Sequence, residues 1–425
     1  MMSTYIANGL WLISEKLVNT VGVLFITILT ARYLGPEKMG VINYALAFGA
    51  IITPIAQLGS QTLLFDKTSK DNLLGRRLLI SSQPMRKVVF ICLFLISILS
   101  INYIVSIDND EFLVFSFVLF SFYFLALDSY RPYFDASLKS KKNSISTQVG
   151  ILLSLAFRFL LVKISAGFFY FSIPYIINHA IPYFIKKNIF KKDLNKIGIS
   201  KRRKRKYKEY MMATGFPLVI ANLSIVIYVK VANILLASLS NISNVAIYNA
   251  AVTLSQGWVF FPMSILTVLF AKVFNEKDQS LKDKGYSFII LLCTIISATF
   301  CLIIFLFKKE ILMITYGEEY ISAVLILPTL AVAGLFSLIG TVGYRVIIHH
   351  GGYKFLMKKM LIVCVFNVFL SYLTIKEFGI LGAAYSILIT EILSSTILNY
   401  FYSKKSLLKI HLGSVSSLSY IRTLK

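Results

Sequence analysis

Three basic residues stand inside long apolar stretches of the sequence: Lys16, Arg158 and Lys230. None of them has an acidic residue three or four positions away, where a helix would bring the two side chains together. A cation that is costly to bury and has no local partner is a candidate ligand for an anion such as phosphate. The alternative is that each cation pairs with an acid on a neighbouring helix or extends its charged end toward water.

A fourth cation, Arg131, has acidic neighbours along the chain. Asp128 lies three residues before it and Asp135 four residues after it, so one continuous helix would place all three on nearly one face. An arginine held between two carboxylates favours a structural clamp over a free anion ligand. Pro132, which lies between them, could loosen the turn and change this register.

Groups that could carry a coupling proton or sodium ion also lie within or near the apolar stretches. The candidate acids are Glu15, Asp128 and Glu391. The histidines at similar positions are His179, His349 and His350. Glu391 could equally be satisfied by hydrogen bonds between helices. The four cysteines have neither the arrangement of a disulfide framework nor the spacing of a metal site, so we expect no metal and no cofactor.

The composition determines which elements must position these residues. Of 425 residues, 57% are hydrophobic and 15% are charged, against about 45–50% and about 25% in a soluble domain. These values exclude a cytosolic enzyme and a disordered chain. The apolar runs are long and unbroken, whereas a membrane β-barrel has short alternating segments. The sequence therefore predicts an all-α integral membrane protein.

A window of about 20 residues, the length of a membrane-spanning helix, predicts twelve spans. Their limits are 8–31, 40–63, 87–107, 112–134, 145–165, 168–186, 211–236, 245–270, 286–307, 321–347, 358–375 and 379–402.

The distribution of basic residues orients these spans. With the N-terminus inside, the inner connections and the C-terminal tail hold 33 of the 44 Lys and Arg residues, the outer connections hold 6, and the spans hold 5. This is the positive-inside bias, so both termini are predicted to be cytoplasmic. It also accounts for most of the net charge of +25 without a nucleic-acid partner.

The predicted spans form two sets of six. We predict an N-terminal half over 1–190, a basic cytoplasmic linker over 191–210 and a C-terminal half over 211–425. The run KRRKRK at 201–206 is expected to lie in this inner loop, where it would rest on anionic lipid headgroups. A shift of 206 positions aligns residues 31–48 with 237–254, with Asn43 opposite Asn249. An even number of spans in each half makes the two repeats parallel, with a substrate cavity between them.

Several segments resemble the Wzx-type polysaccharide flippases. The most specific is ARYLGPEKMG at 31–40, within a similar stretch over 15–59. Further similarity covers Pro217–Leu269, Ile314–Leu327 and Phe378–Phe401. The resemblance implies the twelve-helix fold of the multidrug and toxic compound extruders (MATE). It also implies transport of undecaprenyl-pyrophosphate-linked oligosaccharides to the outer leaflet of a bacterial inner membrane. The expected partners are this lipid-linked substrate, membrane lipids and possible contacts with a glycan polymerase and a chain-length regulator.

Two positions depart from the family's pattern. Arg131, Tyr133 and Phe134 match the close of its fourth span, but Pro132 replaces a small residue. In the seventh span Lys230 stands where relatives commonly carry Arg, and Ala232 replaces the Asp that follows it. The cation is kept and its carboxylate partner is not, which makes Lys230 available to an anion but less well oriented.

Two other functions are alternatives. A cation-coupled drug or toxin extruder would share the fold, but it favours acids in its cavity, whereas the unpaired charges within the spans here are basic. A polytopic glycan polymerase or ligase usually needs a large outer loop for its catalytic site. The longest outer connection predicted here, 308–320, has thirteen residues and no paired carboxylates on a fixed frame. We therefore expect a transporter rather than an enzyme.

Overall fold

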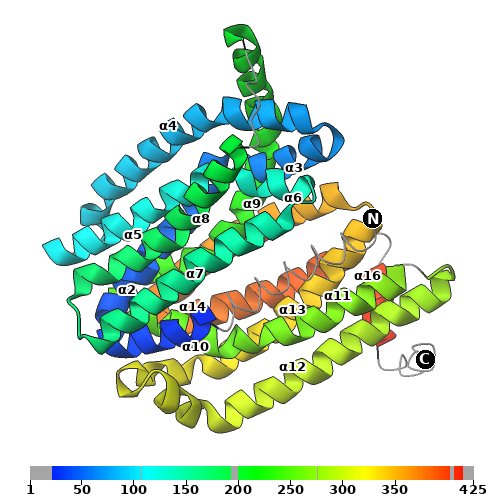
Figure 1. The fold of residues 1–425 in the computed structure, drawn as a ribbon. Helices are drawn as coiled ribbons and strands as arrows, with labels where there is room; N and C mark the ends of the chain where they lie inside the picture. Colours follow the sequence, from blue (N-terminus) through cyan, green and yellow to red (C-terminus); the bar gives the residue numbers. More distant parts are fainter. Residues whose placement is uncertain (1–21, 106, 193–199, 275, 403–405, 415–425) are drawn as a thin grey trace. The chain divides into compact units, whose positions relative to one another are not determined.

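The computed structural model describes residues 22–105, 107–192, 200–274, 276–402 and 406–414 (Figure 1). Within these ranges the chain consists of helices and turns, with no strand. The predicted all-α class is therefore confirmed. Most of the predicted first span lies outside the described residues, and with it Glu15 and Lys16. The helices form two compact units, 1–246 and 247–425, and each is treated separately below. The six-helix halves stay a prediction.

The N-terminal unit is built from helices that are 7 to 39 residues long. Their bounds are α2 Val23–Gln57, α3 Ser60–Lys70, α4 Asn72–Ile104, α5 Asn109–Leu127, α6 Tyr130–Ala136, α7 Ser140–Lys163, α8 Ile173–Lys192 and α9 Lys201–Leu239. Helix α2 packs against α5 and α7, and α8 packs against the same two helices (Figure 1). A 3₁₀ turn, Phe168–Ser172, precedes α8.

Helix α2 changes direction at Gly35, inside the family-like segment ARYLGPEKMG. The backbone there has φ 74° and ψ 172°, a conformation that glycine adopts without a clash of Cβ. Pro36 follows, and the residue before a proline avoids the α-helical region. The outer turn predicted between the first two spans is thus a kink, and residues 23–34 and 36–57 are its two arms.

The predicted fourth span, 112–134, is not one continuous helix. Helix α5 ends at Leu127 and α6 begins at Tyr130, so the prediction that Asp128, Arg131 and Asp135 share one helix face is wrong. The carboxylate of Asp128 accepts a hydrogen bond from the backbone N–H of Arg131 at 3.3 Å, as a capping residue does. Pro132 falls in the first turn of α6, where its missing N–H costs nothing.

The second unit is formed by the end of α10 and the helices that follow. Their bounds are α10 Ile242–Gln256, α11 Phe260–Phe274, α12 Gln279–Thr315, α13 Leu327–His349, α14 Tyr353–Ile392, α15 Leu398–Tyr400 and α16 Ser406–Leu412. A π-helical turn, Leu393–Ile397, separates α14 from α15. Helix α14 contains a break at Gly379, where φ is 55° and ψ is −126°.

Eight helical stretches of the described chain are long and apolar enough to cross a membrane. Two of them contain a break and cover more than one predicted span: α2, at Gly35, and residues 353–400, at Gly379. Helix α8 and the pair α10 and α11 occupy the predicted sixth and eighth spans without meeting that criterion. The chain is thus a multi-pass membrane protein, and the count of twelve stays a prediction.

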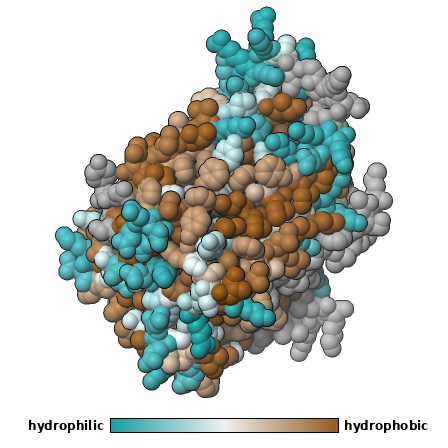
Figure 2. All heavy atoms as spheres, turned by 60° about the vertical axis from the view of Figure 1, so that its left-hand side comes forward, coloured by the Kyte–Doolittle hydropathy of each residue, from teal (hydrophilic) through white to brown (hydrophobic). Residues whose placement is uncertain are grey.

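Exposed apolar side chains support contact with lipid. On α4 they form an exposed series, Val88, Ile91, Leu95, Ile96 and Leu99, each 47–70% exposed. Figure 2 shows broad hydrophobic areas on one face, with hydrophilic side chains gathered apart from them. Apolar surface of this extent is unfavourable in water and normal in a bilayer.

The basic run at 201–206 is helical, and its place on the cytoplasmic side stays a prediction. It forms the first turns of α9, and the hydroxyl of Ser200 accepts a hydrogen bond from the backbone N–H of Arg203 at 3.4 Å. Arg205 donates to Glu209 one turn later at 2.9 Å. Lysine and arginine are good helix formers when their side chains stay in water, and Lys201–Lys206 are all exposed.

Candidate functional site

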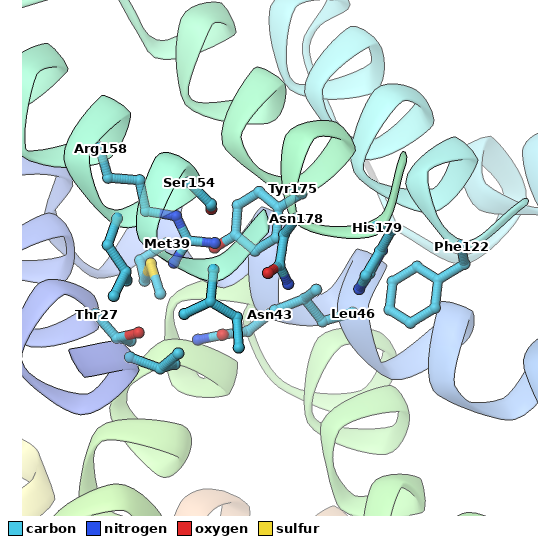
Figure 3. Close-up of a pocket in the computed structure, with 13 residues that line it drawn as sticks. Thr27, Met39, Asn43, Leu46, Phe122, Ser154, Arg158, Tyr175, Asn178 and His179 are labelled. Carbon is cyan, nitrogen blue, oxygen red and sulfur yellow. The ribbon is translucent and has the colours of Figure 1, made fainter. Parts of the chain in front are cut away.

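Four helices of the N-terminal unit line a cavity of about 190 Å³ (Figure 3). Three of them contribute residues three or four positions apart, which share one face. Helix α7 contributes Ile151, Ser154, Leu155 and Arg158, and α8 contributes Tyr175, Asn178 and His179. Both arms of α2 take part, with Val23 and Thr27 before the kink and Met39, Asn43 and Leu46 after it. Phe122 of α5 completes the lining.

Arg158 provides the positive charge of this cavity. Its side chain is 6% exposed, and its guanidinium carbon lies 4.1 Å from the centre of the Tyr175 ring, a cation–π contact. The buried Nε atom has no hydrogen-bond partner in the described chain. There is also no ion pair for Arg158 among the described residues. A buried guanidinium that is not paired with a carboxylate can bind an anion, because its planar group presents several N–H donors.

Close packing of α7 against α8 sets the position of the polar groups beside Arg158. A Cβ atom on Gly150 would lie 2.6 Å from the ring of Pro182, so only glycine fits this contact. Pro182 has no N–H to offer the carbonyl of Asn178, four residues earlier. The side chain of Asn178 lines the cavity in the turn between Tyr175 and Pro182 (Figure 3).

The cavity combines one cation with neutral polar groups. Ser154, Thr27, Asn43 and Asn178 supply hydroxyl and amide groups around Arg158, which can donate hydrogen bonds to phosphate oxygens. Its volume is below the roughly 300–1,000 Å³ of sites for drug-sized ligands. The arrangement can bind an anionic group such as a phosphate. Among the described residues, no group of three or more His, Cys, Asp or Glu side chains could hold a metal ion.

The other predicted cations lie elsewhere. Lys230, on α9, is partly exposed and has no hydrogen-bond or ion-pair partner within the described residues, but it does not line this cavity. Arg131 is exposed. Lys16 and Glu15 fall outside the described residues. Of the predicted cations, the structure therefore places Arg158 at the cavity.

Two of the predicted coupling acids are buried. Asp128 is 6% exposed and forms an ion pair with Lys186 of α8. Glu391, in the second unit, is 8% exposed and lies just before the π-helical turn. Near that turn the buried Lys359 donates to the side-chain oxygen of Asn399 at 2.7 Å.

Several residues at or near these sites had no assigned role in the sequence analysis. Tyr175 and Asn178 line the cavity, and their spacing with His179 on one helical face was a readable signal. The charge distribution predicts that Arg86 and Lys186 face the cytoplasm, yet Arg86 is fully buried and hydrogen-bonded to Ser60, and Lys186 is 2% exposed. Both stand at the ends of predicted spans, where basic residues normally reach water, so the sequence did not separate them from the others.

Comparison with known proteins assigns the family. Residues 5–270 match the family model described as "Polysaccharide biosynthesis protein". The chain belongs to this family. The cavity described above lies within the matched residues. No curated protein sequence matched the chain.

Solved structures show which fold this family member has. The lipid II flippase MurJ in an inward closed conformation aligns with a TM-score of 0.69 and 16% identity, over 98% of this chain and 93% of MurJ. A MATE protein in complex with MaD3S aligns with a TM-score of 0.56 and 12% identity, over 96% of this chain and 97% of the MATE chain. An outward-facing multidrug resistance MATE transporter of the MOP superfamily aligns with a TM-score of 0.55 and 14% identity, over 96% of this chain and 97% of the transporter. The predicted MATE-like fold is thus confirmed.

Proposed function

We propose that this family member is a flippase for undecaprenyl-pyrophosphate-linked oligosaccharide repeat units, which it moves from the cytoplasmic to the periplasmic leaflet. The observation that carries the proposal is Arg158, a buried cation without an acidic partner that lines a polar cavity in a membrane protein of a polysaccharide-biosynthesis family. A diphosphate cannot cross hydrocarbon unaided, because burying an unpaired charge is very costly. A cation in a sheltered cavity offsets that cost.

The fold supports the same conclusion. MurJ, which aligns over almost the whole chain, is named as a lipid II flippase, and transporters built from repeats expose a site to each side in turn. Consistent with a repeat, the α2 kink at Gly35 and the break between α9 and α10 near Asn241 are 206 positions apart. In this proposal the phosphates enter the protein while the polyprenyl tail stays in lipid, and a glycan polymerase acts on the delivered unit.

Deletion of the gene tests the function. We expect complete lipid-linked units to accumulate where an impermeant periplasmic probe cannot reach them, and growth to slow as the shared carrier is sequestered. The measurement is extraction and probing of lipid-linked saccharides from the deletion strain. Complete units that the probe can reach would instead indicate a polymerase or ligase, and an absence of units would indicate a synthetic enzyme.

Substitution of Arg158 tests the site. Arg158→Ala should abolish surface glycan while the protein still inserts, and Arg158→Lys should retain part of the function because it keeps the charge but not the planar fork. Lys163→Ala is the matched control, since Lys163 is an exposed cation on the same helix. Undiminished surface glycan with Arg158→Ala would show that this residue is no phosphate ligand.

A further inference from the structure

His179 is the one titratable imidazole among the residues that line the Arg158 cavity. Its Nδ1 atom lies 3.1 Å from the hydroxyl oxygen of Ser121 on α5. That hydroxyl already donates its only hydrogen to the carbonyl of Val118 at 2.6 Å. It can therefore only accept from His179, which places the ring hydrogen on Nδ1 and leaves a bare lone pair on Nε2.

The other side of the ring is available to a ligand. Within the described residues Nε2 has no hydrogen-bond partner. The Phe122 ring packs edge-on against the imidazole, with 5.0 Å between the ring centres, and fixes its orientation. His179 and Tyr175 lie one turn apart on α8, and the Arg158 guanidinium lies over the Tyr175 ring (Figure 3). Arg158 and His179 line the same cavity on either side of Tyr175, so a diphosphate held by Arg158 would extend toward the imidazole.

Charged side chains from α5, α7 and α8 act on the ring. These side chains are Arg158 on α7, Lys186 on α8 and Asp128 at the end of α5. Asp128 is engaged by Lys186, and α2 contributes only neutral residues to the lining. A second positive charge beside Arg158 is therefore unfavourable until an anion enters. A diphosphate diester carries two negative charges, one more than Arg158 neutralises.

We propose that His179 takes up one proton on Nε2 when the diphosphate headgroup enters the cavity, so that binding of the lipid-linked substrate is coupled to protonation. This inference rests on the proposed function. The proton comes from water, the new Nε2–H bond donates to a phosphate oxygen, and the same proton returns to water when the headgroup leaves. The imidazolium and Arg158 together match the two charges of the diphosphate, so the occupied cavity carries no net charge.

Titration calorimetry on the full-length protein in lipid nanodiscs tests the coupling. The probe is synthetic geranylgeranyl-diphosphate-linked N-acetylglucosamine, a diester that does not itself titrate near neutral pH. Buffers of different ionisation enthalpy report the protons bound. We expect the wild type to take up as much as one proton for each probe molecule. Its affinity should then rise by as much as about tenfold for each pH unit between pH 8 and pH 6.5.

Three variants are compared with the wild type in the same experiment. His179→Asn and His179→Gln should bind the probe without proton uptake, without the rise in affinity toward pH 6.5, and more weakly than the wild type at pH 6.5. His350→Asn, which changes an exposed histidine at the end of α13, should behave as the wild type. Equal proton uptake by the wild type and both His179 variants would overturn the inference, as would wild-type binding without uptake or an unchanged rise in affinity toward pH 6.5 in both folded variants. A wild type that does not bind the probe would overturn the proposed function as well.

Discussion

Lys186 of α8 and Asp128, at the junction of α5 and α6, form an ion pair buried inside the N-terminal unit. Their side chains are 2% and 8% exposed. The second carboxylate oxygen of Asp128 accepts the backbone N–H of Arg131, so one acid both begins α6 and holds α8 against it. Asp128, a candidate coupling acid by sequence, is thereby engaged in the structure of this unit.

Removal of one partner should be strongly destabilising. Lys186→Ala leaves the charge of Asp128 buried without its cation, and such changes cost about 3–5 kcal/mol. The double variant Lys186→Met with Asp128→Asn should recover most of that loss. Thermal and denaturant unfolding in detergent measures both. Lys192→Ala is the control, because this cation is exposed in the last turn of α8. A Lys186→Ala protein as stable as the control would contradict the prediction.

The Lys186–Asp128 pair also shows what sequence reasoning could reach. Asp128 and Arg131 are close along the chain, so spacing alone pairs them, whereas Lys186 is 58 residues away and meets Asp128 only through the packing of α5, α6 and α8. Other local signals agree with the structure. The turn at Gly35 follows from a glycine before a proline, and the helical class follows from unbroken apolar runs.

Arg158 was accessible to sequence reasoning for the same kind of reason, since no acid lies within one turn of it. Its contact with Tyr175 was not, because that contact depends on how α7 and α8 are set against each other. The close approach of Gly150 to Pro182 sets the two helices together, and no periodicity in either helix reveals it. Candidate charged residues can thus be chosen from the sequence, whereas the residues that contact them can be identified only from the structure.

Lys230 should matter for transport and not for stability. It is partly exposed and has no partner in the described part of the chain, so Lys230→Ala removes a charge without leaving another one unpaired. We expect unfolding within about 0.5 kcal/mol of the wild type, as for substitutions that break no specific interaction. Surface glycan should fall by about tenfold. Lys230→Arg, which keeps the charge, should retain most of it. A Lys230→Ala strain with full surface glycan would remove this residue from the candidate ligands.

The C-terminal helix α16 should loosen in acid. His411 donates or accepts through Nδ1 with the Tyr400 hydroxyl at 2.9 Å, and its buried Nε2 has no partner in the described chain. Burial lowers the pKa of His411 below its usual value. Below about pH 6.5 the histidine of the unfolded chain binds a proton more readily than the buried histidine of the folded protein. The contribution of His411 to stability is therefore full above that pH and decreases as the pH falls.

Hydrogen exchange measures the effect on α16. Protection of residues 406–412 should be lower at pH 5.5 than at pH 7.5, after correction for the intrinsic pH dependence of exchange. His411→Gln should lose this pH difference because glutamine does not titrate. Equal protection at both pH values in the wild type would refute a role for His411.

The positive charge at the start of α9 should hold that end of the helix in the cytoplasm. Lys201–Lys206 are exposed along the first turns, ahead of the apolar stretch Asn222–Leu239, and basic residues resist export. A reporter active only in the periplasm should therefore stay silent when it is fused after Lys196. The same reporter fused after Asp108, in the connection between α4 and α5 that is predicted to be outer, should be active. Activity after Lys196 would invert the topology, and the direction of transport proposed here would then need the headgroup to enter from the opposite side.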